Sequence, residues 1–410
     1  MKKTILSILI ITSLFISGCN SSKNGELSSD IINNKPYPQH TLYYSETISP
    51  NIYSQKEKDQ HVSLYYEDWK EKYVVNEDGI YRVAFGDKGS KDFDITVSEG
   101  QGYGMIISVI MSGYDPESKK IYDGMLKFVK NNPSKFKNGL MNWKVDKNNY
   151  QENDSAFDGD ADIAYSLILA HKQWGSQGNI NYLEEAKEMI DNIYTYTIGK
   201  DSYLPMLGDW VDPFGSKYNQ YTNRSSDLML ENFYQFSIID SKWGNVLNKS
   251  KISINELQDN NSLTAMLLPD FFKSDTYEPE EKNFLEGEND GYYSYNAVRY
   301  PLRTGIYTLL QKDNNLRERL SNLSEWIENK SDSNLDKVYS GYDLQGNVLK
   351  GSNYNSSIFI STFGIAAMHN KDQQDWLNRI YENVKDRHEG YFEDTVTLLS
   401  LLVMSNNYWE

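Results

Sequence analysis

The chain has 410 residues, of which 39% are apolar, so it is long enough for one large domain or two ordinary ones and is not a disordered protein. Its formal net charge of −17 argues against a nucleic-acid partner, because a phosphate backbone is bound through Lys and Arg. The single cysteine, Cys19, excludes an intramolecular disulfide. The five histidines lie far apart in the sequence, so we expect neither a metal nor another cofactor.

The N-terminus combines a short basic region with an apolar stretch, Ile5–Ile16, that is too short to span a bilayer. Small residues then precede Cys19, which resembles the bacterial lipobox, where the chain is cut before a cysteine that receives lipid. The alternative is an ordinary signal peptide followed by a chance cysteine. We expect a signal peptide over residues 1–18 and lipidation at Cys19, with the protein anchored on the outer face of the bacterial cell membrane.

The polar, Asn/Ser/Lys-rich stretch after Cys19 predicts a flexible tether over residues 19–45. No second linker follows, so residues 46–410 are expected to form one domain, which we take to be monomeric. Apolar residues recur mostly at helical spacing and predict around eleven or twelve helices, while strand-like alternation is rare, as in residues 81–85. The segments with helical spacing are 104–113, 118–131, 163–174, 183–198, 226–240, 297–311, 317–329, 373–385 and 393–405. This pattern fits a ring of paired helices as well as an irregular bundle.

Glu99 stands in the densest motif of the chain, beside the alternate glycines 100, 102 and 104 and before an apolar helix. We expect these glycines to allow a tight turn and a close approach to a ligand. A carboxylic acid that protonates a leaving oxygen must be held neutral in a partly buried place, and Glu99 is a candidate for it. The simpler interpretation is a Glu that favours a helix N-terminus, whose dipole would stabilise the ionised form.

Three aspartates alternate in the segment Asp158-Gly159-Asp160-Ala161-Asp162. A calcium-binding EF-hand is excluded, because the sixth position of the loop is Ile163 and the twelfth is Leu169. An N-cap role for Asp158 or Asp160 is the ordinary interpretation, and it is compatible with binding sugar hydroxyls at a cleft.

The Glu99 and Asp158 motifs, about sixty residues apart, resemble the two conserved segments of glycoside hydrolase family 8. Further matching segments occur in the same order along residues 55–410. They are Gly139-Leu140-Met141-Asn142-Trp143, Gly208-Asp209-Trp210, Tyr295-Asn296-Ala297-Val298-Arg299 and Gly390-Tyr391-Phe392.

The resemblance implies an all-α fold, an (α/α)6 barrel of six inner and six outer helices with a long substrate cleft across one end. It also implies hydrolysis with inversion at the anomeric carbon, with Glu99 as the general acid and Asp158 holding the sugar at the point of cleavage. By the same resemblance, five further side chains line the cleft: Trp143, Trp210, Tyr295, Arg299 and Tyr391. For each Trp, ordinary core packing is the alternative.

The chain departs from one branch of this family at Asn296, where that branch has an Asp as general base. An amide cannot accept a proton at neutral pH, so Asn296 is not the base. A second branch, with chitosanases and lichenases, also carries Asn there and takes a Glu from the preceding loop. Glu286 is our choice for the base, with Glu288 as the alternative two residues later.

These features together predict an endo-acting, inverting glycoside hydrolase on a β-1,4-linked or mixed β-1,3/1,4-linked polysaccharide. Endoglucanase, lichenase and chitosanase activities all remain open at this point. The rival hypothesis is an inactive, lipid-anchored carbohydrate-binding protein on the same fold. The missing Asp at position 296 favours the rival, whereas the intact Glu99 speaks against it.

Overall fold

A computed structural model of the chain describes residues 33–410, which form one compact unit. The predicted signal peptide and Cys19 lie outside the described residues. In residues 33–410 there are twelve α-helices: α1 (Gln55–Tyr73), α2 (Ser98–Ile110), α3 (Ser118–Asn131), α4 (Phe157–Trp174), α5 (Tyr182–Thr197), α6 (Leu230–Ile239), α7 (Trp243–Asn261), α8 (Tyr300–Gln311), α9 (Asn314–Lys330), α10 (Ser357–Ala367), α11 (Gln374–Val384) and α12 (Tyr391–Met404).

Short strands and three of the four 3-10 turns connect these helices on the side where the chain enters the inner ones, while the fourth 3-10 turn follows the inner helix α10. The strands are β1 (Val74–Glu77), β2 (Ile80–Val83), β3 (Ile95–Val97), β4 (Lys144–Asp146), β5 (Thr222–Arg224), β6 (Phe271–Lys273) and β7 (Glu278–Pro279). All pair antiparallel, as β1-β2, β3-β4 and β5-β6-β7. The 3-10 turns are η1 (Ser225–Asp227), η2 (Ala297–Arg299), η3 (Leu335–Lys337) and η4 (Lys371–Gln373). The predicted strand at 81–85 corresponds to β2.

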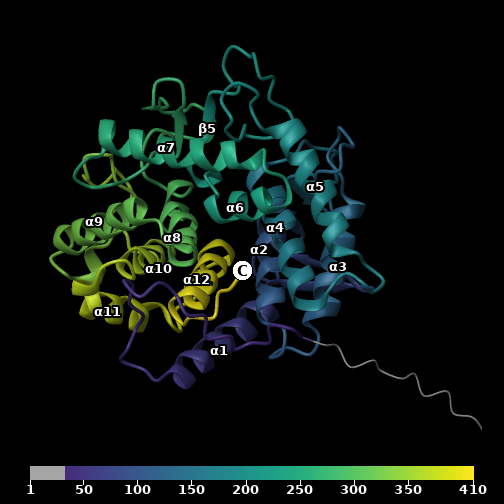
Figure 1. Cartoon of the computed structure of the whole chain (residues 1–410), viewed down its shortest axis with the longest axis horizontal. Coiled ribbons are helices and arrows are strands. Elements are labelled where there is room, and N and C mark those ends of the chain that lie inside the picture. Colours follow the sequence, from purple (N-terminus) through teal and green to yellow (C-terminus); the bar gives the residue numbers. More distant parts are fainter. Residues whose placement is uncertain (1–32) are drawn as a thin grey trace, which may run out of the picture. The chain divides into compact units, whose positions relative to one another are not determined.

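The helices form two concentric rings (Figure 1). The even-numbered helices α2, α4, α6, α8, α10 and α12 lie inside, each contacts the next, and α12 contacts α2 to close the ring. The odd-numbered helices lie outside them. The predicted (α/α)6 barrel is therefore confirmed.

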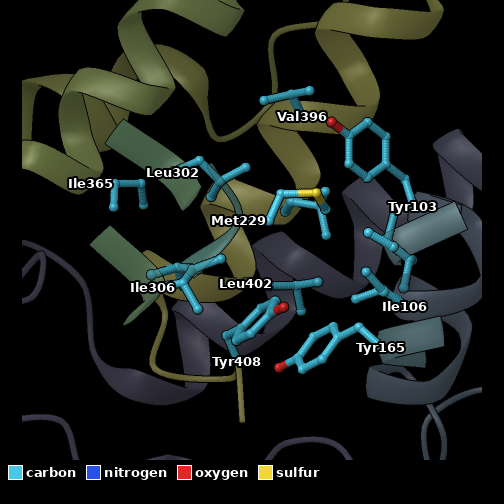
Figure 2. Packing of buried hydrophobic residues seen from close by; sticks show 14 of the residues in the cluster. Tyr103, Ile106, Tyr165, Met229, Leu302, Ile306, Ile365, Val396, Leu402 and Tyr408 are labelled. Atoms are coloured by element: carbon cyan, nitrogen blue, oxygen red, sulfur yellow. The ribbon is translucent and has the colours of Figure 1, made fainter. Parts of the chain in front are cut away.

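The inner helices are more fully buried than the outer ones, because inner helices are covered on all sides and outer helices on one face only. Every residue of α10 is buried, whereas α11 buries one face with Trp376, Leu377, Ile380, Tyr381 and Val384. Figure 2 shows side chains of several inner helices meeting in the middle of the ring, among them Tyr103, Tyr165, Leu302 and Leu402. Each such apolar side chain contributes about 1.5–3 kcal/mol through its removal from water.

The glycines beside Glu99 lie inside α2, which begins at Ser98, six residues before the predicted start. Our expectation that they form a tight turn is wrong. They allow close packing of helices instead: a Cβ at Gly102 would lie 2.7 Å from Asp162 Cβ and 3.1 Å from the Gly159 carbonyl oxygen of α4. The missing side chain thus brings the first turns of α2 and α4 together.

The N-terminal segment of the compact unit crosses the end of the barrel where the inner helices finish. Four of its backbone N–H groups donate to carbonyls at or just after the C-terminal ends of inner helices. The pairs are Asn34–Gln173 (α4), Tyr37–Ser112 (α2), Thr41–Asn406 (α12) and Ile48–Met368 (α10). Residues 33–45 were expected in the tether, so the predicted boundary at residue 45 lies too far along the chain. No helix in residues 33–410 is long and apolar enough to span a membrane.

Candidate active site

The N-terminal ends of inner helices meet at the opposite end of the barrel from this segment. Glu99 lies in the first turn of α2, Asp158 in the first turn of α4, and Arg299 in η2, directly before α8. Together with Glu286, from the loop between β7 and η2, these three side chains line a pocket of about 340 Å³. Residues that are 200 positions apart in the sequence therefore share one cleft.

Arg299 joins the two acidic side chains of the helix ends. Its Nη1 atom lies 2.7 Å from Glu99 Oε1 and 2.8 Å from Asp158 Oδ2. Its Nη2 atom donates to Ser226 Oγ and Asn296 Oδ1, both at 2.9 Å. The guanidinium is only 3% exposed, so these ion pairs are little screened by water.

The two acids respond differently to this environment. Burial raises the pKa of Glu99, and this effect outweighs the opposing charge of Arg299. Burial would also raise the pKa of Asp158, but Arg299 and Arg224 together hold that pKa below its usual range. The site therefore contains one carboxyl group that retains its proton more readily than a free Glu and one that is held ionised.

The remaining two aspartates of the Asp158 motif have structural partners. The N-cap of α4 is Ala156 and no side chain caps the helix, so our N-cap interpretation of Asp158 and Asp160 is wrong. Asp160 Oδ1 accepts from the Met141 N–H at 2.8 Å, and this bond holds the segment that leads to Trp143. Asp162 forms an ion pair with Arg303 inside the barrel.

Glu286 enters the cleft from a loop and is held by two donors. Arg224 Nη2 donates to its Oε1 atom and Asn296 Nδ2 donates to its Oε2 atom, each at 2.8 Å. The Glu286 side chain is 47% exposed, as a group that meets substrate must be. Glu288 is exposed as well, but it does not line the pocket, so the structure places Glu286 rather than Glu288 in the cleft.

Aromatic side chains form the walls of this pocket. Trp143 is 40% exposed. Its carbonyl accepts from the N–H of Ser98, the residue before Glu99, at 2.9 Å. Tyr295 lines the pocket with its hydroxyl 3.0 Å from that of Tyr354. Phe85 and Phe392 complete the lining, and we had not assigned either of them to the site. Such flat apolar faces beside polar groups suit sugar rings.

Two of the predicted cleft residues lie outside the pocket wall. Trp210 is partly buried and packs edge-on against Tyr218, with 5.2 Å between ring centroids. Tyr391 is 5% exposed and lies behind the wall, with its ring 5.1 Å from that of Phe85. The residues next to them in the sequence are closer to the site. Asp209 accepts from the Ser155 N–H at 2.8 Å, and Phe392 lines the pocket.

Arg224 is the charged residue that sequence reasoning missed. It lies in β5, in no segment of the resemblance, and only the pairing of β5 with β6 brings it beside the loop of Glu286. Within residues 33–410 no group of three or more His, Cys, Asp or Glu side chains is arranged to hold a metal ion.

Comparison with known proteins agrees with this geometry. The family model of glycosyl hydrolases family 8 matches residues 43–406. A β-glucanase of Niallia circulans is 39% identical over 92% of this chain and 91% of its own length. An endoglucanase of Bacillus sp. (strain KSM-330) is 36% identical over 95% of this chain and 84% of its own. The solved structure of a β-1,3-1,4-glucanase from Paenibacillus sp. X4 has a TM-score of 0.87 and 38% identity, covering 92% of this chain and 99% of that one. The chain therefore belongs to family 8 of the glycoside hydrolases and is an endo-acting enzyme of that family.

Proposed function

We propose that the enzyme cleaves mixed-linkage β-1,3-1,4-glucan with inversion, using Glu99 as general acid and Glu286 as general base. The observation that carries this proposal is the presence of both carboxyl groups in one aromatic-walled cleft, on different elements. A Glu from the preceding loop together with Asn at position 296 is the arrangement that the resemblance implies for the branch with chitosanases and lichenases. Similarity to proteins described as a β-glucanase and a β-1,3-1,4-glucanase favours this substrate over chitosan.

Glu99 suits the role of proton donor because its carboxyl group is partly buried. The general acid of a glycoside hydrolase must carry its proton near neutral pH, which requires a raised pKa. Burial supplies that effect for Glu99. The Arg299 contact opposes it, and a sugar that enters the pocket removes further water from the carboxyl group and strengthens the effect of burial.

Glu286 suits the role of base because it is a carboxyl group separated from Glu99 by other side chains. Arg299 bonds both Glu99 and Asn296, and Asn296 bonds Glu286, so two intervening groups keep the carboxyl groups out of contact. An inverting enzyme needs its two carboxyl groups ~6.5–9.5 Å apart, with room between them for the water that attacks the sugar. Asp158, held ionised by Arg299, is placed to accept hydroxyl groups of the sugar at the point of cleavage.

The substrate is tested with a panel of barley β-glucan, lichenan, carboxymethylcellulose, xylan and chitosan. Reducing-end release and viscosity are followed together, because an endo-acting enzyme lowers viscosity before many ends appear. We expect the highest kcat/KM on barley β-glucan and lichenan, and the α-anomer as the first product by ¹H NMR. A higher kcat/KM on chitosan would contradict the proposed substrate, and a β-anomer would contradict inversion.

The roles are tested with three Glu→Gln variants. Glu99→Gln and Glu286→Gln should each lower kcat about 10²–10⁴-fold, the usual contribution of general acid–base catalysis. Oligosaccharide binding by calorimetry should remain, because Gln keeps the shape of each side chain. Glu288→Gln is the matched control in the same loop and should keep near-normal rates. A collapse of activity in Glu288→Gln with an active Glu286→Gln would reverse the assignment of the base.

We also propose that Cys19 carries the lipid that anchors the enzyme on the outer face of the cell membrane. The first described residues lie at the end of the barrel opposite the cleft, so the chain that comes from Cys19 joins the barrel away from the cleft. Cells grown with labelled palmitate should incorporate the label into the wild-type chain and not into Cys19→Ser, with specific activity unchanged. Equal incorporation into that variant would overturn the anchor.

A further inference from the structure

The Glu286 loop is poorly supported by packing after Phe284. Glu286 faces the cleft, while Asn283 and Phe284, which precede it in the loop, line a second cavity of about 410 Å³. The loop meets the core at Phe284, whose ring lies 5.2 Å from that of Tyr218 and 5.6 Å from that of Phe271. Leu285 is 37% exposed and Glu286 is 47% exposed, so apolar packing contributes little to the position of the loop after Phe284.

Hydrogen bonds to one buried carboxylate, that of Asp290, hold the backbone of this loop instead. Asp290 Oδ2 accepts from the Leu285 N–H at 2.7 Å and from the Glu286 N–H at 3.0 Å. Asp290 Oδ1 accepts from the Gly287 N–H at 2.9 Å. Three consecutive backbone donors are thus gathered on a side chain whose residue is only 2% exposed.

Asp290 is itself tied to the sheet that carries Arg224. Its carbonyl accepts from the Phe271 N–H of β6 at 2.8 Å, and β6 pairs with β5 so that Arg224 stands opposite Phe271. Asp290 therefore fixes the backbone of Glu286 to the same sheet from which Arg224 reaches its carboxylate.

We propose that Asp290 is a positioning residue of the reaction, which folds residues 285–287 around its carboxylate and so aims Glu286 at the substrate. The proposal rests on the proposed role of Glu286 as general base. An ionised carboxylate accepts three N–H donors at once, whereas the amide of Asn has a single acceptor oxygen and turns donor hydrogens toward the others. Charge-assisted bonds of this kind are also stronger than neutral ones.

The test is a double-mutant cycle between Asp290→Asn and Glu286→Gln. Asp290→Asn should lower kcat about a hundredfold, as expected when a catalytic group is displaced by about 1 Å, with little change in KM. If Asp290 acts only through Glu286, adding Asp290→Asn to Glu286→Gln should cause no further loss. Losses that multiply in the double variant, or a normal kcat in Asp290→Asn, would overturn the proposal.

Asp343→Asn is the matched control, because Asp343 Oδ1 also accepts two backbone N–H groups, from Gln345 at 3.0 Å and Asn347 at 2.8 Å, outside the cleft. It should keep its kcat. If Asp290→Asn does not fold, Asp290→Ser, which keeps one acceptor oxygen, takes its place in the cycle. Loss of the fold in both would also overturn the proposal, because Asp290 would then act through domain stability. An active Glu286→Gln would instead refute the base assignment.

Discussion

Asn296 donates a hydrogen bond to Glu286, with 2.8 Å between Nδ2 and Oε2. An amide at this position can donate to a carboxylate, whereas an aspartate would repel it. Asn296, which stands where one branch of the family has its base, is therefore a hydrogen-bond partner of the proposed base. This relationship removes the motive for treating the chain as an inactive binding protein.

Asn296→Asp should move the acidic limb of the kcat/KM profile to higher pH. Two carboxylates at this distance repel each other, so the pair in the variant keeps one proton to higher pH than an isolated carboxyl group does. The measurement is kcat/KM on barley β-glucan between pH 4 and pH 9. Asn347→Asp is the control, because Asn347 donates in the same way to Asp343 at 2.9 Å on an exposed turn. An unchanged acidic limb in Asn296→Asp would contradict the proposed base.

Tyr103→Phe should move the alkaline limb of the same profile to higher pH. The Tyr103 hydroxyl is one of the groups that lower the pKa of Glu99, so its loss lets burial raise that pKa further. A general acid with a higher pKa keeps its proton, and its activity, to higher pH. Tyr165→Phe removes a buried hydroxyl elsewhere in the barrel and should leave the limb in place. A shift to lower pH in Tyr103→Phe would show that another group governs the limb.

Trp143→Ala should raise KM for oligosaccharides about fivefold with little change in kcat. This loss corresponds to about 1 kcal/mol, typical of one aromatic contact. Trp210→Ala is the comparison, because Trp210 lies outside the pocket wall and packs on Tyr218. It should lower the thermal midpoint more than it raises KM. Equal effects of the two variants on KM would place Trp210 in the substrate path after all.

Asp162→Asn should lower the free energy of unfolding by about 3–5 kcal/mol, because it leaves Arg303 buried without its charged partner. Arg303 Nη1 and Nη2 both donate to Asp162, and the Asp162 side chain is fully buried. Asp259→Asn removes a similar pair with Arg319, but Asp259 is 50% exposed, so it should cost less than about 1 kcal/mol. Urea unfolding of both variants measures the difference. Similar losses in the two would mean that burial does not set the strength of these pairs.

Helical spacing identified nine of the twelve helices in residues 33–410, five inner and four outer, and missed three. The outer helix α3 was predicted with its exact bounds, because its polar and apolar residues alternate at helical period. The inner helix α10 is apolar all round, so it has no stripe for periodicity to detect. The helices α1 and α7 were missed as well, and many of their residues are polar.

The sequence by itself determined the residue types of the site and their order along the chain. Glu99, Asp158 and Arg299 were identified because each stands in a compact local segment that resembles a segment of glycoside hydrolase family 8. Which of Glu286 and Glu288 enters the cleft, and that Arg224 and Asp290 hold it there, was decided only by the tertiary structure. The reason is physical: the direction of a loop side chain is set by hydrogen bonds to partners distant in sequence, and the local sequence pattern does not indicate such bonds.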